Sequence, residues 1–348
     1  MLRHWMVILG LVLVLGDVAG NEAQQELVFL TWADYVDPDV VAEFEAEEGV
    51  KVQFVYFESD FKRNEILVQT QAQGFDVANV DGGSIGVVGG RGWLMPVSEQ
   101  TIPNLAHTDP AQRMAYEGGQ RYGVPYTWGT IGIAYRADLV EQPIESWMQL
   151  FRPEPALHGK IVMIEDPREL VGMALKALGH SINSENLTEL AEAERLLQEQ
   201  RPLVKSYSYV SLTERSALVT GEAAAAMVYN GDALMLQQYE PNIRFVVPPE
   251  GTGMWVDYLA VLSSSPRKAL AARFIDFMNR PEIAARNAEY LYYATPNRAA
   301  ERLLPSEFLA DDRIYPNAET LRRSEPFVTK LAPRAVKARQ KIYARLQR

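Results

Sequence analysis

The chain has 348 residues, with 45 acidic and 34 basic side chains, a formal net charge of −11 and no cysteine. This balance argues against nucleic acid or an anionic membrane as a partner and suits a cationic ligand. Without cysteine there is no disulfide framework, and four scattered histidines predict neither a transition-metal site nor another cofactor.

The first twenty residues have the pattern of a secretory signal peptide. Arg3 and His4 form a short basic region, an apolar run extends from Trp5 to Gly16, and small residues follow at 18–20. The run is shorter than the roughly 20 residues of a membrane-spanning helix. A buried N-terminal strand and a membrane anchor are the alternatives. We expect residues 1–20 to be cleaved and, since no cysteine follows to carry a lipid, the mature protein to be free in the periplasm.

Strand and helix patterns alternate over the next segment. Asp37 followed by Pro38 is typical of a helix N-terminus, with aspartate as the cap and proline at the first helical position. The predicted elements are strand Glu26–Trp32, helix Pro38–Glu48, strand Val50–Phe57, helix Phe61–Gln73 and strand Asp76–Val80. This βαβαβ order predicts a mostly parallel sheet with helices on both faces.

A second alternating set follows a predicted strand at Thr130–Tyr135. Its elements are strand Lys160–Ile164, helices Glu169–Leu178 and Asn186–Gln198, strands Ala223–Tyr229 and Met254–Leu262, helix Pro266–Asn279 and a helical tail. Two sets in a chain of this length predict two α/β lobes. We assign residues 26–126 plus 256–303 to lobe 1 and residues 127–255 plus 304–348 to lobe 2. Ligands of such sheets bind beyond the carboxyl ends of the strands, so a cleft between the lobes is expected.

Aromatic and acidic residues gather near the predicted strand ends. Trp255 and Asp257 lie two apart on a strand, so their side chains share one face. An aromatic face beside a fixed negative charge suits an organic ammonium ion. Comparable groupings follow other strands: Trp32, Asp34 and Tyr35 near the start, Asp81 and Tyr229 in the middle, and Tyr292 and Tyr293 near the end. A single strand aromatic mostly packs in a core, but the recurrence predicts a site for a cation.

Seven short motifs stand along the chain in order: TWADY at 31–35, GVKV at 49–52, PYTWG at 125–129, DPRE at 166–169, YNGD at 229–232, WVD at 255–257 and TPN at 295–297. None is specific alone. In this order and spacing they resemble the periplasmic polyamine-binding proteins of bacterial ABC importers, the spermidine- and putrescine-binding type. The resemblance covers nearly the whole chain from Leu27 onward. It implies the two-lobed periplasmic-binding-protein fold, whose lobes close on the ligand like a hinge.

The resemblance also implies which aromatic residues bind the ligand. Trp32 and Tyr35 match rings that flank the ligand's methylene groups from the first lobe. Trp255 matches a stacking indole, and Tyr293 matches another wall of the aromatic box. Tyr229 stands where relatives have a tryptophan.

The acidic residues follow in the same way. Asp257 matches the carboxylate that pairs with an ammonium, and Asp34 and Asp232 are similar to acids of putrescine-type members. Asp166 and Glu169 match acids near one amine. Asp166 and Glu169 also fit a capping box with proline at the first helical position, and Asp232 could cap a helix, so capping stays open for Asp166 and Asp232.

Three positions depart from the pattern. Spermidine-type members have serine and tyrosine where this chain has Asp81 and Gly83, and glutamine where it has Phe327. A carboxylate is gained, which places Asp81 among the candidate site residues, whereas an aromatic wall and a hydrogen bond are lost. The ligand therefore stays open among putrescine, cadaverine, spermidine and norspermidine, with an opine or another cationic amine as an alternative.

Together these observations predict a monomeric solute-binding protein that captures a di- or polyamine and delivers it to an ABC permease. The alternative partner is a membrane-bound polyamine sensor, for example one controlling cyclic-di-GMP.

An enzyme is not expected. Residues 82–86 (GGSIG) match the G-x-S-x-G pattern of a nucleophile elbow, but no glycine-rich oxyanion segment precedes them. We expect Ser84 to begin a helix and the glycines to let the backbone approach the ligand. Tyr207 and Tyr209 are expected to be packing residues.

Overall fold

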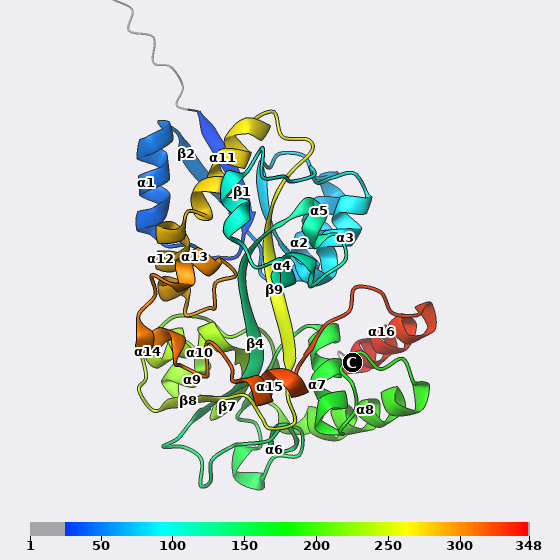
Figure 1. The fold of residues 1–348 in the computed structure, drawn as a ribbon. Coiled ribbons are helices and arrows are strands. Elements are labelled where there is room, and N and C mark those ends of the chain that lie inside the picture. Colours follow the sequence, from blue (N-terminus) through cyan, green and yellow to red (C-terminus); the bar gives the residue numbers. More distant parts are fainter. Residues whose placement is uncertain (1–24, 347–348) are drawn as a thin grey trace, which may run out of the picture.

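A computed structural model describes residues 25–346, which form two lobes (Figure 1). The long strands β4 (Val124–Arg136) and β9 (Gly253–Val261) run through both lobes. They pair with each other as antiparallel neighbours where they pass from one lobe to the other. The predicted signal peptide lies outside the described residues. No helix between residues 25 and 346 is long and apolar enough to span a membrane.

The strands form one continuous mixed sheet in the order β2-β1-β3-β9-β4-β7-β5-β6. The outer pairs β1–β2, β1–β3, β5–β6 and β5–β7 are parallel, whereas the pairs β3–β9, β4–β9 and β4–β7 are antiparallel. Two more strands lie beside this path, β8 on β4 and β10 on β9. The remaining bounds are β1 Glu26–Thr31, β2 Lys51–Tyr56, β3 Val77–Asp81, β5 Ile161–Met163, β6 Ser206–Tyr207, β7 Ala225–Tyr229, β8 Ile243–Val246 and β10 Glu325–Pro326.

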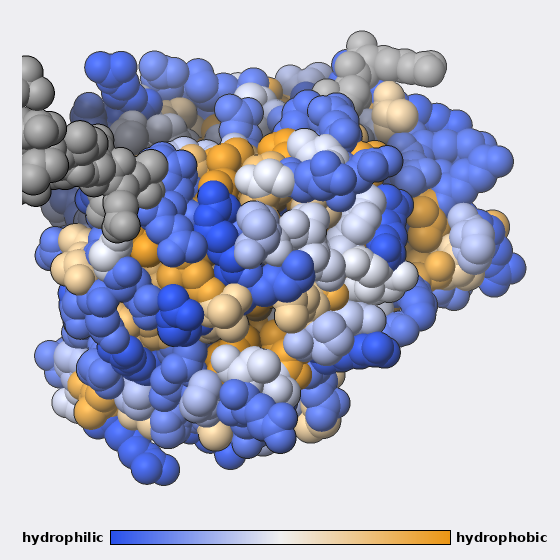
Figure 2. All heavy atoms as spheres, turned by 90° about the horizontal axis from the view of Figure 1, so that it is seen from above, coloured by the Kyte–Doolittle hydropathy of each residue, from blue (hydrophilic) through white to orange (hydrophobic). Residues whose placement is uncertain are grey.

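Helices cover both faces of the sheet in the first lobe. Phe29 and Leu30, neighbours on β1, point to opposite faces, where Phe29 meets α1 and α11 and Leu30 meets α2 and α3. The helices are α1 Pro38–Glu48, α2 Asp60–Gln69, α3 Gly82–Gly90, α4 Pro110–Met114, α5 Gly119–Tyr122, α11 Lys268–Met278, α12 Pro281–Leu291 and α13 Arg298–Glu301, with a 3₁₀ turn at Pro103–His107. Seen from above, hydrophilic residues cover most of this lobe, and hydrophobic atoms show between them (Figure 2).

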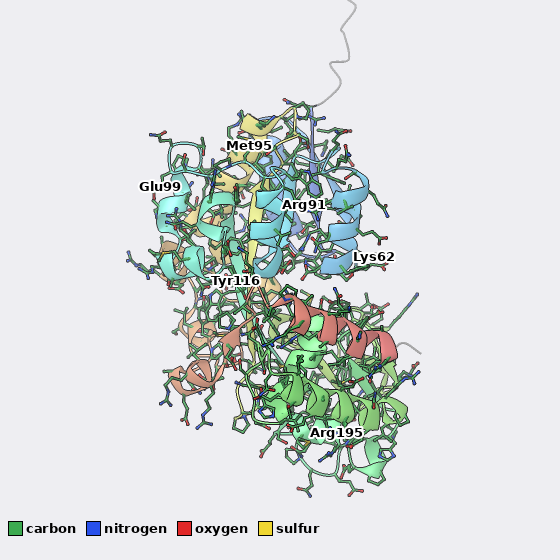
Figure 3. The ribbon with its side chains drawn as sticks, turned by 90° about the vertical axis from the view of Figure 1, so that its right-hand side faces the viewer. Lys62, Arg91, Met95, Glu99, Tyr116 and Arg195 are labelled. Atoms are coloured by element: carbon green, nitrogen blue, oxygen red, sulfur yellow. The ribbon has the colours of Figure 1, made fainter. Side chains whose placement is uncertain are left out.

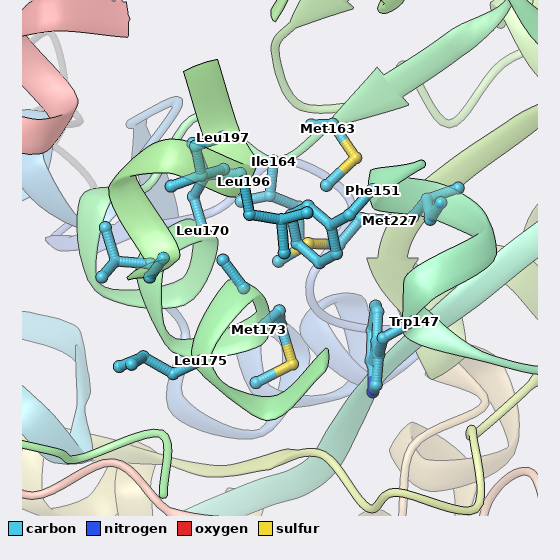
Figure 4. Close-up of a cluster of buried hydrophobic side chains, with 14 of the residues drawn as sticks. Trp147, Phe151, Met163, Ile164, Leu170, Met173, Leu175, Leu196, Leu197 and Met227 are labelled. Carbon is cyan, nitrogen blue, oxygen red and sulfur yellow. The ribbon is translucent and has the colours of Figure 1, made fainter. Parts of the chain in front are cut away.

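The second lobe has the same layered arrangement. Trp147, Phe151, Leu170 and Met173 pack together in a fully buried cluster under the sheet (Figure 4). The helices are α6 Trp147–Phe151, α7 Pro167–Ala177, α8 Leu187–Gln200, α9 Ala217–Thr220, α10 Asn230–Gln237, α14 Ser306–Leu309, α15 Ala318–Arg323 and α16 Pro333–Leu346, with 3₁₀ turns at Pro155–Leu157 and Arg201–Leu203. Two of the predicted lobe boundaries fall within β4 and β9 and the third between α13 and α14, and all three remain a prediction.

Most predicted elements differ by one or two residues at their ends, and two differ by more. The strand expected at Thr130–Tyr135 extends over Val124–Arg136, because its first half pairs with β9 and its second half with β7 and β8. The helix expected to reach Gln73 ends at Gln69, since the next residues turn through left-handed backbone at Gln71 and Ala72.

Helix α7 begins at a side-chain cap. The carboxylate of Asp166 accepts hydrogen bonds from the backbone N–H groups of Arg168 at 2.8 Å and Glu169 at 3.1 Å, and Pro167 occupies the first helical position. Asp166 is therefore the N-cap of α7, as the capping alternative proposed. The cap fixes the first turn of α7, which carries Arg168 and Glu169 toward the first lobe.

We predict that Asp166→Ala lowers the free energy of unfolding by about 1 kcal/mol, because two backbone donors lose their acceptor. Asp166→Asn should keep most of the stability, since its side-chain oxygen can still accept these bonds. Urea unfolding followed by circular dichroism measures both variants. Equal losses for alanine and asparagine would show that the charge of Asp166, rather than its cap, stabilises the fold.

Candidate ligand-binding site

A cavity of about 360 Å³ lies between the lobes and is lined by residues of both. It brings together all of the predicted site residues except Asp166, namely Trp32, Asp34, Tyr35, Asp81, Glu169, Tyr229, Asp232, Trp255, Asp257 and Tyr293. They lie at or just beyond the ends of β1, β3 and β7, on β9, on the first turns of α7 and α10, and after α12. Trp255 and Asp257 reach the cavity from one face of β9, as their spacing predicts.

Asp257 is buried and held by a tyrosine. The hydroxyl of Tyr35 donates to the Asp257 carboxylate at 2.9 Å and lies 2.8 Å from the hydroxyl of Thr127. Burial, together with repulsion from Asp60 and Asp81, raises the pKa of Asp257 to about 8, although the bond from Tyr35 opposes this. A proton or an external cation is therefore needed to keep this carboxyl group stable in its place.

Two further carboxylates have the same arrangement. The Tyr229 hydroxyl donates to Glu169 at 2.9 and 3.0 Å, and the Tyr293 hydroxyl donates to Asp232 at 2.6 Å. Burial raises the pKa of Asp232 to about 6 and that of Glu169 well above its usual value, where Asp166 adds to the effect. Asp232 lies in the first turn of α10 but makes no capping bond. The structure thus favours its cavity position over the capping alternative.

Aromatic rings form a belt of consecutive contacts around these acids. Trp255 lies edge-on against Tyr229 at 5.7 Å and Tyr293 at 4.8 Å between ring centroids. The belt continues from Tyr293 to Tyr35 at 6.1 Å on one side, and from Tyr229 through Tyr209 to Trp32 on the other. It joins both lobes. Asp34 lies exposed at the rim, with left-handed backbone at φ 54°.

Asp81 lines the cavity, but its carboxylate is already paired. Arg63 approaches one oxygen at 2.5 Å and Arg168 the other at 2.9 Å. Burial would raise the pKa of Asp81, yet the two guanidinium groups bring it below its usual value. Asp60 completes the group, 2.6 Å from Arg63 and 3.5 Å from Arg168. The sequence analysis selected neither Asp60 nor the two arginines.

The glycines before Ser84 make room for neighbouring side chains. A Cβ at Gly82 would overlap the ring of Tyr116, which lies where the two lobes meet (Figure 3), and a Cβ at Gly83 would overlap the Arg168 guanidinium. The helix begins at Gly82, two residues before the expected start at Ser84. Gly82 and Gly83 also line the cavity, so the expectation that they admit backbone close to the ligand stays a prediction.

Tyr209 packs against the core of the second lobe, as expected, but it also has a place at the cavity. Its ring lies 5.8 Å from that of Trp32, and together with residues 210–213 it lines the cavity. The loop carries no periodic pattern that would have placed it there. Tyr207 does pack against the core of the second lobe. Phe327 is buried and lines the cavity, with the Arg168 guanidinium 5.2 Å from its ring centroid.

Comparisons with known proteins agree with this architecture. A model of the bacterial extracellular solute-binding proteins matches residues 39–317. The norspermidine sensor of Vibrio cholerae serotype O1 is 33% identical over 305 residues, which cover 87% of this chain and 84% of that protein. The spermidine/putrescine-binding periplasmic protein of Escherichia coli K12 is 30% identical over 316 residues, which cover 90% of each chain.

Solved structures give the same result. A putative spermidine/putrescine ABC transporter protein from Listeria monocytogenes superposes with a TM-score of 0.82 at 30% identity, covering 93% of this chain and 99% of that one. The likeness confirms the two-lobed α/β fold expected from the sequence. With a family match over residues 39–317 and these relatives along most of its length, the chain belongs to the bacterial extracellular solute-binding proteins.

Proposed function

We propose that this protein captures a di- or polyamine in the cavity between its lobes and delivers it to an ABC importer. One observation carries the proposal: Asp257, which is buried, and Asp232, which is partly buried, are acids whose only polar side-chain partners within residues 25–346 are hydroxyl groups. A buried carboxylate without a cation is costly. A ligand that brings ammonium groups removes that cost.

The aromatic belt supports the same ligand class. A polyamine alternates ammonium groups with methylene segments, so it needs carboxylates at intervals and apolar walls between them. Rings such as Trp255 contribute about 0.5–2 kcal/mol for each cation they face. The charge-assisted hydrogen bonds to the acids contribute about 1.5–3 kcal/mol each. Relatives named for spermidine, putrescine and norspermidine agree with this class.

We further propose that the mature protein is a monomer, released by signal-peptide cleavage without a lipid anchor, and that it does no chemistry. Binding followed by lobe closure is then its whole activity. In the G-x-S-x-G segment, the Ser84 hydroxyl accepts a hydrogen bond from the Asn64 amide at 3.3 Å. Of the residues described here, none that lines the cavity is a histidine that could act as its base.

A membrane sensor is the second candidate partner, favoured by the 33% identity to a norspermidine sensor. The two functions share a ligand and differ in what receives the closed protein. Deleting the gene from its host and measuring uptake of labelled putrescine and spermidine separates them. Lost uptake supports import, whereas normal uptake with an altered polyamine response supports sensing.

We predict that Asp257→Asn weakens diamine and polyamine binding more than tenfold, a loss of over 1.4 kcal/mol. The ammonium group loses its charged partner, whereas the amide can still accept the Tyr35 hydrogen bond. The melting temperature of the free protein should change little, because the buried carboxyl forms no ion pair within the part of the chain that the structure describes. Isothermal titration calorimetry and thermal unfolding measure the two effects.

The exposed Asp312→Asn is the matched control, since it removes the same charge outside the cavity. It should leave both affinity and melting temperature unchanged. Unchanged affinity in Asp257→Asn would remove Asp257 from the ligand contacts. A similar loss in both variants would mean that only the overall negative charge attracts the amine.

We also predict that amine affinity rises between pH 6 and pH 8. Below its pKa of about 8, Asp257 is largely protonated in the free protein, so an ammonium must expel that proton to bind. Binding at pH 7 should therefore release protons, which calorimetry in buffers of different ionisation enthalpy detects. Asp257→Asn should lose most of the release. Binding that is independent of pH and buffer would contradict the protonated state.

A further inference from the structure

Arg168 stands in surroundings that would suit a ligand's ammonium group. Its guanidinium lies 2.9 Å from Asp81, 3.5 Å from Asp60 and 5.2 Å from the ring centroid of Phe327, and its side chain lines the cavity. Carboxylates on one side and an aromatic face on another are the features of a cation site. Here the cation belongs to the protein.

Two acids of this group share the same two bases, since Asp60 and Asp81 both face Arg63 and Arg168. Arg168 also lies 3.9 Å from the Glu169 carboxylate, its neighbour in the chain. Arg63 is completely buried and is held by both acids. The acids therefore already have cationic partners, in contrast to the hydroxyl-held Asp257 and Asp232 across the same cavity. Removing Arg168 would leave two cavity-lining carboxylates with a single guanidinium between them.

The local backbone is shaped for this guanidinium. Gly83 lies on the first turn of α3, and any side chain there would overlap the Arg168 Nη1 atom. Arg168 reaches this place from the capped first turn of α7. Asp60 and Asp81 come from the start of α2 and the end of β3, so the contact forms only when α7 lies against the first lobe.

We propose that Arg168 is a built-in cation that occupies one ammonium position of the cavity and thereby determines how many ammonium groups a ligand brings. With Asp60 and Asp81 paired internally, the cavity binds a diamine at Asp257 and the remaining hydroxyl-held acids, and it disfavours a third ammonium. This assignment of Arg168 as a specificity residue rests on the proposed amine-binding function.

The test compares the dissociation constants of putrescine, a diamine, and spermidine, a triamine, by calorimetry on the mature protein. Arg168→Gln frees Asp60 and Asp81 for a third ammonium. It should lower the spermidine-to-putrescine ratio of dissociation constants at least tenfold. Loss of a repelling charge alone strengthens both amines, and the triamine more because it carries one more charge. The freed position is therefore identified by a tenfold change in the ratio that Gly83→Ala, which keeps the charge of Arg168, also produces.

Three further variants define the effect. Arg168→Lys keeps a cation in place and should keep the ratio within threefold of the unmodified protein. Gly83→Ala displaces the guanidinium without removing its charge, so it should lower the ratio even if Arg168→Gln does not fold. Lys330→Gln removes the cation of the exposed Lys330–Glu117 pair and serves as the control with an unchanged ratio.

Ratios that stay within threefold in both Arg168→Gln and Gly83→Ala, while putrescine still binds, would overturn the role of Arg168 and leave the proposed function standing. An equal shift in Lys330→Gln would also overturn it, because any lost cation would then suffice. An unmodified protein that binds neither amine would overturn the proposed function and this inference together.

Discussion

Buried carboxylates without a matching cation are the constraint on which this molecule depends. Asp257 and Asp232 are held by tyrosine hydroxyls, which orient the acids but do not neutralise them. Glu169 is held by Tyr229 in the same way and has only Arg168, at 3.9 Å, as a cationic neighbour among residues 25–346. Such an arrangement stabilises the free protein poorly and a positively charged guest well. The sheet, the helix caps and the aromatic belt hold these acids around one cavity of about 360 Å³.

The same cavity treats its acids in two different ways. At Asp81 the protein supplies its own guanidinium groups, whereas none from residues 25–346 is paired with Asp257. This difference between the surroundings of Asp81 and those of Asp257 follows from local geometry. Gly83 leaves space for a long side chain from the opposite lobe, whereas the surroundings of Asp257 are filled by Tyr35 and Thr127. A difference of a few atoms thus decides which acids remain for the ligand.

Much of the cavity could be predicted because its residues follow local rules. Side chains two apart on a strand share a face, which puts Trp255 beside Asp257 on β9. Trp32 and Asp81 lie at the carboxyl ends of β1 and β3, where ligands of such sheets bind. What could not be predicted depends on distant partners. Arg168 and Asp81 are 87 positions apart, and no local pattern reveals that their side chains meet between lobes. The length of β4 likewise depends on pairing with β9 and β7, which only the tertiary fold defines.

Strands β4 and β9 have a mechanical consequence. Where they pass between the lobes they are hydrogen-bonded to each other, with partners from Val124 and Leu259 to Thr130 and Met254. A bonded pair of strands forms a ribbon, which bends readily out of its plane but resists bending within it. The lobes are therefore not free to swivel independently. Their relative movement is confined largely to one angular coordinate, so a small number of contacts across the cavity suffices to govern the position of the whole second lobe.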